Sequence, residues 1–200
     1  MQANNSFTPK LTFGQTLNPH LWVSAHADYL YTYAITRIND ADLAKDLVQE
    51  TFLAALEKTE NFEGRSSERT WLTAILKNKV IDVYRKRSTG INKAKNVAIA
   101  EKQQHDFFEQ GDGHWSPEHR PAEFIAQTAD PLHDKEFAKV LALCTQKLPA
   151  LWLSVFSMKL MDDEETDKIC FELKLTPANF WVIIHRTKLN LRACLQKNWI

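Results

Sequence analysis

The chain has 200 residues, with 25 Lys plus Arg against 25 Asp plus Glu, so its formal net charge is zero. This length suits one domain or two small ones, and a hydrophobic share of 44% is enough for packed cores. No apolar run approaches the roughly 18 residues that a membrane span needs, and the N-terminus has no secretory pattern. Three scattered cysteines, Cys144, Cys170 and Cys194, fit neither a disulfide framework nor a CxxC metal site. These features predict a reduced, cytoplasmic protein.

Charge alternates strongly along the chain although the total is zero. Residues 40–61 carry a net charge of −4, residues 62–95 carry +6, and residues 101–136 carry −6. Residues 162–167 hold five carboxylates in six positions, and residues 168–200 carry +5. A single charged block is usually a solvated face. Two basic blocks separated by an acidic one indicate contact with polyanions at two places and with another surface elsewhere.

Helical periodicity dominates the first part of the chain. Few segments alternate apolar and polar residues, so the pattern predicts an all-α fold. After an N-terminal extension at residues 1–18, a first small helical domain is expected over residues 19–88. Its helices are expected after Pro19, after a cap at Asn39 or Asp40, and after a cap at Ser66 or Ser67.

Periodicity fails between residues 89 and 131, and this polar, mostly acidic stretch predicts a flexible linker. A second small helical domain is expected over residues 132–200. Within it, a helix over 163–173, capped by Asp162 or Asp163, precedes a short turn and a helix that opens at Thr176-Pro177. This spacing is typical of a DNA-binding helix-turn-helix, although ordinary helical hairpins share it.

An ordered series of motifs runs through the first domain. DLVQETF at 46–52 precedes FEG at 62–64, TWL at 70–72 and YRKR at 84–87. In this order the motifs closely resemble region 2 of the sigma-70 family of bacterial RNA polymerase sigma factors. With the helix-turn-helix as region 4 and only a linker between, the chain is similar to the extracytoplasmic-function (ECF) subgroup. The resemblance covers residues 21–87 and 134 to about 196.

The resemblance implies a sigma factor that binds core RNA polymerase and directs promoter recognition, DNA melting and transcription initiation, without catalysis or a cofactor of its own. The implied partners are core polymerase, through its β′ coiled coil and β flap, promoter DNA and an anti-sigma factor of the kind the family often has. An acidic helix suits Arg-rich partner helices through charge-assisted hydrogen bonds. The residues predicted to bind polymerase are Asp42, Asp46, Leu47, Gln49 and Glu50.

The same resemblance implies two groups of DNA-binding residues. Region 2 melts the −10 element and holds its non-template strand, and flipped bases and phosphate contacts repay the unstacking. The predicted residues there are Arg65, Ser66, Ser67, Arg69, Lys77, Asn78, Arg85 and Lys86. Region 4 reads the −35 element, with predicted contacts from Thr176, Asn179, Trp181, His185, Arg186 and Lys188. Family members commonly carry Arg or Lys where this chain has Trp181 and Ile183, and an exposed aromatic side chain there would also suit a protein partner such as an anti-sigma factor.

Other classes of function find less support in the sequence. A stand-alone helix-turn-helix regulator would carry the same second domain but would bind DNA without polymerase. The linker gathers metal-ligand types at His105, Asp106, Glu109, Asp112, His114 and His119, but an irregular segment offers no rigid frame, so no metal site is predicted. The chain also lacks a phosphate-binding glycine loop, a nucleophile elbow and an HExxH motif, so it is not expected to be an enzyme.

Overall fold

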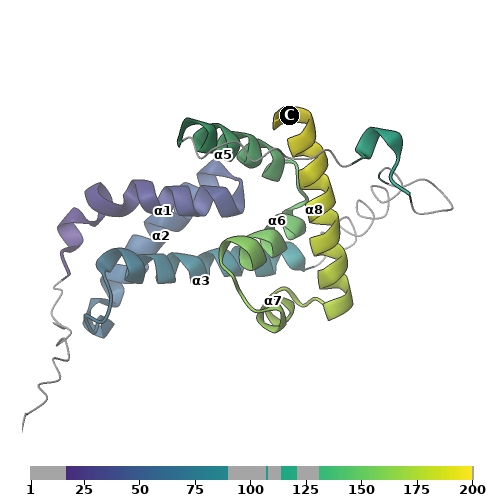
Figure 1. Ribbon diagram of the computed structural model, residues 1–200. Coiled ribbons are helices and arrows are strands. Elements are labelled where there is room, and N and C mark those ends of the chain that lie inside the picture. Colours follow the sequence, from purple (N-terminus) through teal and green to yellow (C-terminus); the bar gives the residue numbers. More distant parts are fainter. Residues whose placement is uncertain (1–16, 90–106, 108–113, 121–130, 200) are drawn as a thin grey trace, which may run out of the picture.

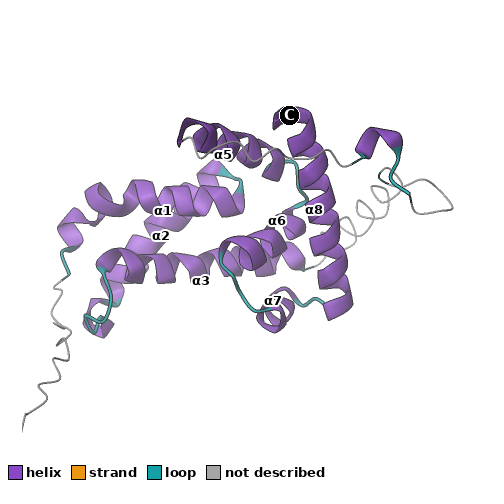
Figure 2. Cartoon of the chain, viewed as in Figure 1, coloured by secondary structure: helices purple, strands orange, loops and turns teal. Residues whose placement is uncertain are grey.

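The computed structural model describes residues 17–89, 107, 114–120 and 131–199, and every regular element in these residues is a helix (Figures 1 and 2). The helices form one group before the predicted linker and one group after it. The all-helical fold class with two helical groups is therefore confirmed. Residues 22–88 are called the N-terminal lobe below, and residues 131–199 are called the C-terminal lobe. No helix in the described ranges has both the length and the apolar content to cross a membrane.

The N-terminal lobe contains α1 (Trp22–Ile38), α2 (Ala41–Glu57) and α3 (Glu68–Ser88), with short 3₁₀ turns η1 (Pro19–Leu21) and η2 (Thr59–Asn61). Two of the predicted caps are present. The Asp40 side chain accepts a hydrogen bond from the Leu43 amide at 3.1 Å, and Ser67 accepts one from the Thr70 amide at 3.2 Å. These bonds satisfy amides that the first turn of a helix leaves open, so they fix where α2 and α3 begin.

The apolar faces of these helices form a common core. Trp22, Leu30, Leu72 and Tyr84 are all at most 1% exposed. The Tyr84 hydroxyl donates to the Arg37 carbonyl oxygen at 3.3 Å, which gives this buried polar group a partner. Burial also raises the pKa of Tyr84 well above its usual value, so the phenol stays neutral.

The C-terminal lobe contains α5 (Pro131–Thr145), α6 (Ala150–Phe156), a π-helical turn η4 (Ser157–Met161), α7 (Thr166–Leu173) and α8 (Pro177–Trp199). Trp152 and Phe180 are fully buried in its core. Thr176 accepts a hydrogen bond from the Asn179 amide at 3.3 Å, as the predicted cap of α8 requires.

The predicted cap of the preceding helix was wrong. The residue before α7 is Glu165, whose side chain makes no capping hydrogen bond, so neither Asp162 nor Asp163 caps it. Asp162 accepts hydrogen bonds from Arg37 of α1 instead. The carboxylate is therefore used between the lobes, and α7 begins three residues later than the sequence predicted.

The two lobes lie against each other. α6 contacts α1 and α3, α7 contacts α3, and the buried residues of both lobes join into one apolar cluster (Figure 1). This contact between the two lobes was not predicted from the sequence. Most of residues 89–131, the predicted linker, lie outside the described residues.

One described piece of the predicted linker contacts α8. Residues 114–120 include a short 3₁₀ turn, η3 (Pro117–His119). The Arg120 carbonyl oxygen accepts a hydrogen bond from Gln196 at 3.0 Å, and the Arg192 guanidinium lies 5.6 Å from the centre of the Trp115 ring. Aromatic and backbone groups thus attach this piece to the C-terminal half of α8.

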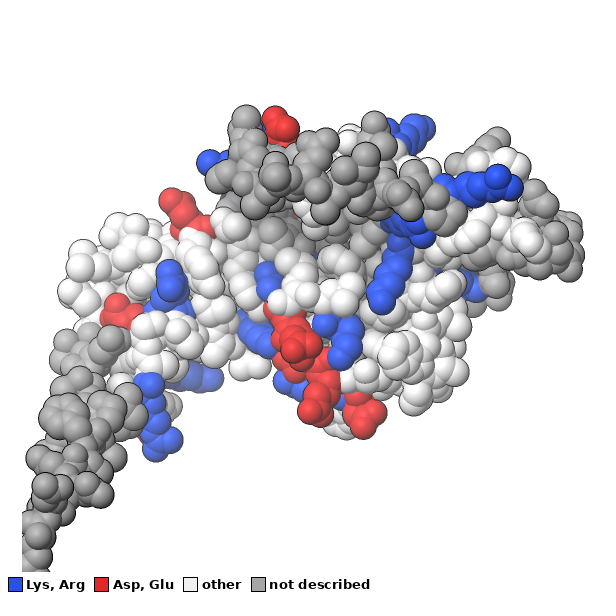
Figure 3. Space-filling view, viewed as in Figure 1, with Lys and Arg blue, Asp and Glu red and all other residues white. Residues whose placement is uncertain are grey.

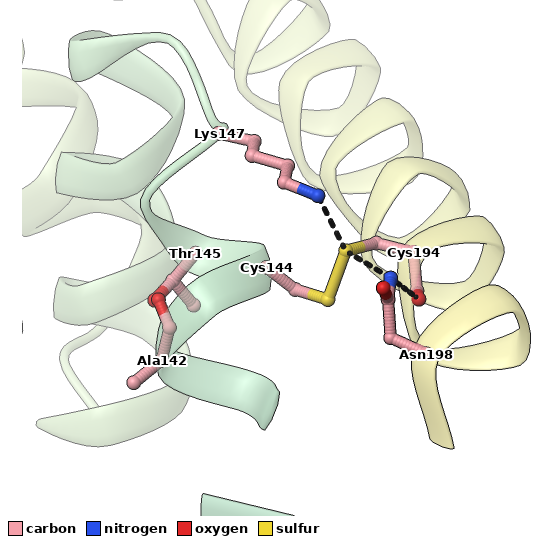
Figure 4. The surroundings of a disulfide bond; sticks show 6 residues. All are labelled: Ala142, Cys144, Thr145, Lys147, Cys194 and Asn198. Carbon is pink, nitrogen blue, oxygen red and sulfur yellow. Dashed lines mark hydrogen bonds between the residues drawn. A yellow bond between two sulfur atoms is a disulfide. The ribbon is translucent and has the colours of Figure 1, made fainter. Parts of the chain in front are cut away.

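A disulfide joins Cys144 of α5 to Cys194 of α8, with Cα atoms 5.7 Å apart (Figure 4). The prediction of a chain with no disulfide framework was therefore wrong. The two cysteines are 50 residues apart in sequence, and only the packing of α5 against α8 brings them together. The third cysteine, Cys170, is buried and forms no disulfide, as the sequence predicted for all three.

Candidate protein- and nucleic-acid-binding surfaces

The predicted polar face of α2 is open to solvent. Asp42, Asp46, Gln49 and Glu50 are all exposed, because their spacing of four, three and one residues keeps them on one side of the helix. Glu50 pairs with Lys79 of α3 at 3.0 Å, which orients one of the carboxylates. Leu47 was also predicted to contact polymerase, but it is only 4% exposed and packs in the core.

An apolar hollow lies beside this acidic face. A cavity of about 390 Å³ lies between α1 and α2. It is lined by Val23, Tyr31, Val48 and Phe52, with Ala27, Asp28, Lys45 and Gln49. Val23 and Leu53 are more than 60% exposed. The sequence prediction missed these apolar residues. Exposed apolar positions on the outward side of each helix were the signal that could have found them.

The loop before α3 carries one exposed basic side chain and packs on an aromatic cluster. Arg65 is largely exposed and pairs with Glu63 at 2.5 Å. Ser66 is half-buried, and the Ser67 side chain is used as the cap of α3. Trp71 packs against Trp22 and Phe62, with ring centres 6.0 and 5.2 Å away, so it supports the loop and lies partly buried against the core.

Arg69, at the start of α3, lies with its guanidinium 5.1 Å from the centre of the Tyr29 ring. This geometry is that of a cation–π contact, which fixes the side chain while leaving its nitrogens able to donate. Arg69 is exposed. It can therefore still contact a phosphate.

The predicted basic face of α3 is only partly open. Asn78 and Lys86 are exposed. Lys77 pairs with Glu164 at 2.6 Å, and Arg85 donates from Nε to Glu172 at 2.7 Å. Two of the five predicted DNA contacts on this helix are thus bound to acids of the C-terminal lobe.

Those acids belong to the carboxylate-rich block before and within α7. Figure 3 shows acidic side chains gathered there with Lys and Arg on either side. Glu164 accepts from Lys168 at 2.7 Å as well as from Lys77, and these two hydrogen bonds lower its pKa. Glu164 therefore stays ionised at neutral pH and neutralises Lys77 of α3.

A buried ion pair anchors the same contact between the lobes. Arg37 donates to Asp162 from two nitrogens, at 2.6 and 3.2 Å, and both side chains are less than 10% exposed. The guanidinium also lies 3.5 Å from the centre of the Tyr33 ring and donates to the Tyr33 carbonyl oxygen. Burial raises the pKa of Tyr33 to about 12. Because a buried charge is costly without its partner, this pair depends on both lobes being in place.

The outward face of α8 carries most of its predicted contact residues. Asn179, Trp181, His185 and Lys188 are exposed, and Arg186 is half-buried. Thr176 is exposed and caps the helix. The apolar run that departs from the family pattern splits into two parts: Trp181 is 59% exposed and Ile183 is 8% exposed. Ile183 therefore belongs to the core, whereas Trp181 and the neighbouring Val182, which is 43% exposed, present apolar surface outward.

No metal centre is found among the described residues, where no group of three or more His, Cys, Asp or Glu side chains could hold an ion. His119 instead packs edge-on against Phe107 and pairs with Ser116 at 3.0 Å. His105, Asp106, Glu109 and Asp112 lie outside the described residues.

Comparison with known proteins identifies the family. Residues 22–89 match the family model "Sigma-70 region 2". A "Probable RNA polymerase sigma factor" of Haemophilus influenzae is 35% identical over 168 residues, which cover 84% of each chain. The "ECF RNA polymerase sigma factor SigM" of Bacillus subtilis is 24% identical over 82% of this chain and 86% of its own. SigX of the same organism is 39% identical over 34% of this chain and 35% of its own.

A solved structure of the sigma factor RpoE in complex with the anti-sigma factor NepR from Bartonella quintana covers 90% of this chain and 97% of that chain. The identity is 19% and the TM-score is 0.39, which is too weak a likeness to support a structural argument.

The chain belongs to the sigma-70 family of RNA polymerase sigma factors. It is an ECF-type sigma factor that directs transcription initiation, and it is not an enzyme.

Proposed function

We propose that the chain is a dissociable promoter-specificity subunit with separate surfaces for polymerase and for DNA. The acidic face of α2 binds core polymerase at its β′ coiled coil, and the C-terminal lobe binds near the β flap. The loop before α3 and α3 itself open the −10 element, and α8 reads the −35 element. Because polymerase transcribes in the cytoplasm, the proposed location is cytoplasmic.

The observation that carries this proposal is the combination on α2. Four polar side chains form one exposed face, Asp42, Asp46, Gln49 and Glu50, beside an apolar hollow of about 390 Å³. A partner helix that carries both Arg and apolar side chains fits such a surface. The carboxylates orient such a helix by pairing with its Arg side chains, and the hollow buries its apolar side chains. A solvated face alone would have no use for the exposed Val23 and Leu53.

In-vitro transcription tests the proposal. Purified core polymerase is incubated with genomic DNA fragments, with and without this chain, and the 5′ ends of the transcripts are sequenced. We expect discrete start sites only when the chain is present, with a shared upstream pattern. Transcripts whose start sites do not depend on the chain would contradict the proposal.

DNA binding on this account requires the lobes to part. Lys77 and Arg85 reach a DNA strand only when Glu164 and Glu172 release them. Asn78 and Lys86 are exposed already. The free chain is therefore expected to bind promoter DNA poorly without polymerase.

We expect replacement of Lys77 or Asn78 with Ala to reduce open-complex formation by about tenfold each, since losing one strand contact costs about 1–3 kcal/mol. Permanganate reactivity of −10 thymines measures opening, and fluorescence anisotropy measures binding to core polymerase. Binding should change less than twofold. Lys58→Ala, an exposed lysine at the end of α2, is the matched control and should leave both readouts unchanged. Equal losses in opening and polymerase binding would contradict the separation of roles.

An anti-sigma factor is a further proposed partner. Its support is exposed aromatic surface on the C-terminal lobe, where Phe171 is 81% exposed and Trp181 is 59% exposed. Large exposed aromatic side chains are typical of protein interfaces.

A further inference from the structure

The Cys144–Cys194 disulfide forms part of the wall of a cavity of about 540 Å³ beside the C-terminal half of α8. The cavity is also lined by Lys147, Arg192 and Lys197, and by the aromatic side chains of Phe107 and Trp115. Cys194 lines the cavity and is half-buried, whereas Cys144 is only 2% exposed. Cys194 is therefore the more accessible residue of the disulfide.

The cavity carries positive charge. Within the described ranges, no carboxylate pairs with Lys147, Arg192 or Lys197. The Nε of Arg192 is buried and has no hydrogen-bond partner there either. Three cations that converge on one hollow raise the local concentration of small anions.

Two donors point at the accessible sulfur. The Lys147 ammonium lies 3.9 Å from Sγ of Cys194, and the Asn198 amide nitrogen lies 3.5 Å from the same atom (Figure 4). A purely structural disulfide does not require a cation beside one of its sulfur atoms. A nearby ammonium favours a thiolate, so these donors suit the departure or arrival of negative charge at Cys194.

We propose that Cys144–Cys194 is a thiol-reducible disulfide and that the basic cavity admits a small anionic thiol, whose thiolate attacks Sγ of Cys194.

The exchange proceeds in two steps. The first thiolate forms a sulfur–sulfur bond to Cys194, the bond between Cys194 and Cys144 breaks, and Cys144 leaves with the electron pair as a thiolate. A second thiolate attacks the small-molecule sulfur of this mixed disulfide and releases Cys194 as a thiolate beside Lys147. Two small thiols are thereby oxidised to one disulfide, the two protein sulfurs gain two electrons, and the protons of the thiols pass to Cys144 and Cys194 as their pKa values require.

The disulfide decides how firmly α5 is held. Among residues 135–145 of this helix, Cys144 alone is buried. The remaining attachment is partial, through the half-buried Val140 and Leu141 and an edge contact of Phe137 with Trp199, with ring centres 5.4 Å apart. A helix of 15 residues is marginal without tertiary support, so reduction loosens α5 from α8.

This inference rests on the proposed function in one respect, the cytoplasmic location. Thiols are kept reduced there, and the disulfides that do form are mostly transient or redox-sensing. Cys170 provides an internal reference: burial and the charge of Asp167 raise the pKa of its thiol, so it reacts slowly.

Reduction of the purified full-length chain by three small thiols of different charge tests the proposal: 2-mercaptoethanesulfonate, 2-mercaptoethanol and cysteamine. Rates are expressed per thiolate at low salt and are followed by alkylation and intact mass. We expect the anionic thiol to react about tenfold faster than the neutral one and the cationic one to be slowest, since each nearby charge acts through a partly screened Coulomb interaction. Equal rates for the three thiols would overturn the anion-selective cavity. Three alkylatable cysteines in unfolded protein purified without reductant would overturn the disulfide itself.

Variants complete the test. Lys147→Gln, Arg192→Gln and Lys197→Gln should each reduce the preference for the anionic thiol, whereas Lys135→Gln, an exposed lysine of α5, should leave it intact. Hydrogen exchange of residues 136–145 should speed up at least about tenfold on reduction of the wild-type chain, because opening of α5 becomes easier. Cys144→Ser should match the reduced protein. Unchanged exchange would overturn the effect on α5, and because no readout uses transcription, either failure leaves the proposed function standing.

Discussion

Reversing Asp46 and Glu50 together to Lys is expected to weaken binding to core polymerase by about 1,000-fold. Disrupting a close charge pair at an interface costs about 2–5 kcal/mol, so two reversals cost at least about 4 kcal/mol, and each 1.4 kcal/mol is a factor of ten. Both side chains are exposed, so the fold should survive. Far-UV circular dichroism checks the helix content, and fluorescence anisotropy with labelled protein measures affinity.

The matched control for this variant changes the same number of charges elsewhere in the same lobe. Glu57 and Glu60 are exposed at the end of α2 and in η2. Reversal of these two to Lys should change affinity less than about tenfold, because rim charges mainly alter the association rate. Asp46→Asn with Glu50→Gln should fall between the two variants. Equal losses in both double reversals would show that net charge, and not the face of α2, governs binding.

Replacing Asp162 with Ala is expected to destabilise the folded chain by about 3–5 kcal/mol, because it leaves the buried Arg37 charge without its partner. Both side chains of the pair are less than 10% exposed, so water cannot solvate the guanidinium in place. Urea unfolding followed by circular dichroism measures the change. If the lobes part before they unfold, small-angle X-ray scattering should show a larger radius of gyration at low urea.

Two further variants separate burial from charge. Asp42→Ala removes an exposed carboxylate that pairs with Lys45, and its cost should stay below about 1 kcal/mol. Arg37→Met with Asp162→Leu replaces the buried pair by apolar groups and should recover most of the loss, since such exchanges are often neutral or stabilising. An Asp162→Ala protein with wild-type stability and dimensions would show that the lobes do not rest on this pair in solution.

Local signals in the sequence predicted the elements well. Asp40, Ser67 and Thr176 mark helix starts because a short oxygen-bearing side chain satisfies open amides, and this requires no knowledge of the rest of the fold. The exposed residues of α2 and α8 were also predictable, because helical period alone puts Asp46 and Lys188 outward.

Long-range pairs were not predictable in the same way. Arg37 and Asp162 are 125 residues apart, and Cys144 and Cys194 are 50 apart, so neither contact leaves a spacing signal. Asp162 was predicted to cap a helix because a local rule was applied to a residue with a distant partner. Leu47 shows the opposite case: its period predicts burial, and the family motif alone suggested contact with a partner.

The pairing of Lys77 with Glu164 and of Arg85 with Glu172 changes how the DNA affinity of this protein depends on salt concentration. While Glu164 and Glu172 hold these two cations, the cations neutralise no phosphate, so the DNA keeps the counterions that they would otherwise release. For single strands, each newly neutralised phosphate otherwise contributes about 0.7 to the slope of log affinity against log salt. The DNA affinity of the isolated chain should therefore fall less steeply with salt than the number of cations on α3 suggests. The full salt dependence should appear only once polymerase has drawn the lobes apart.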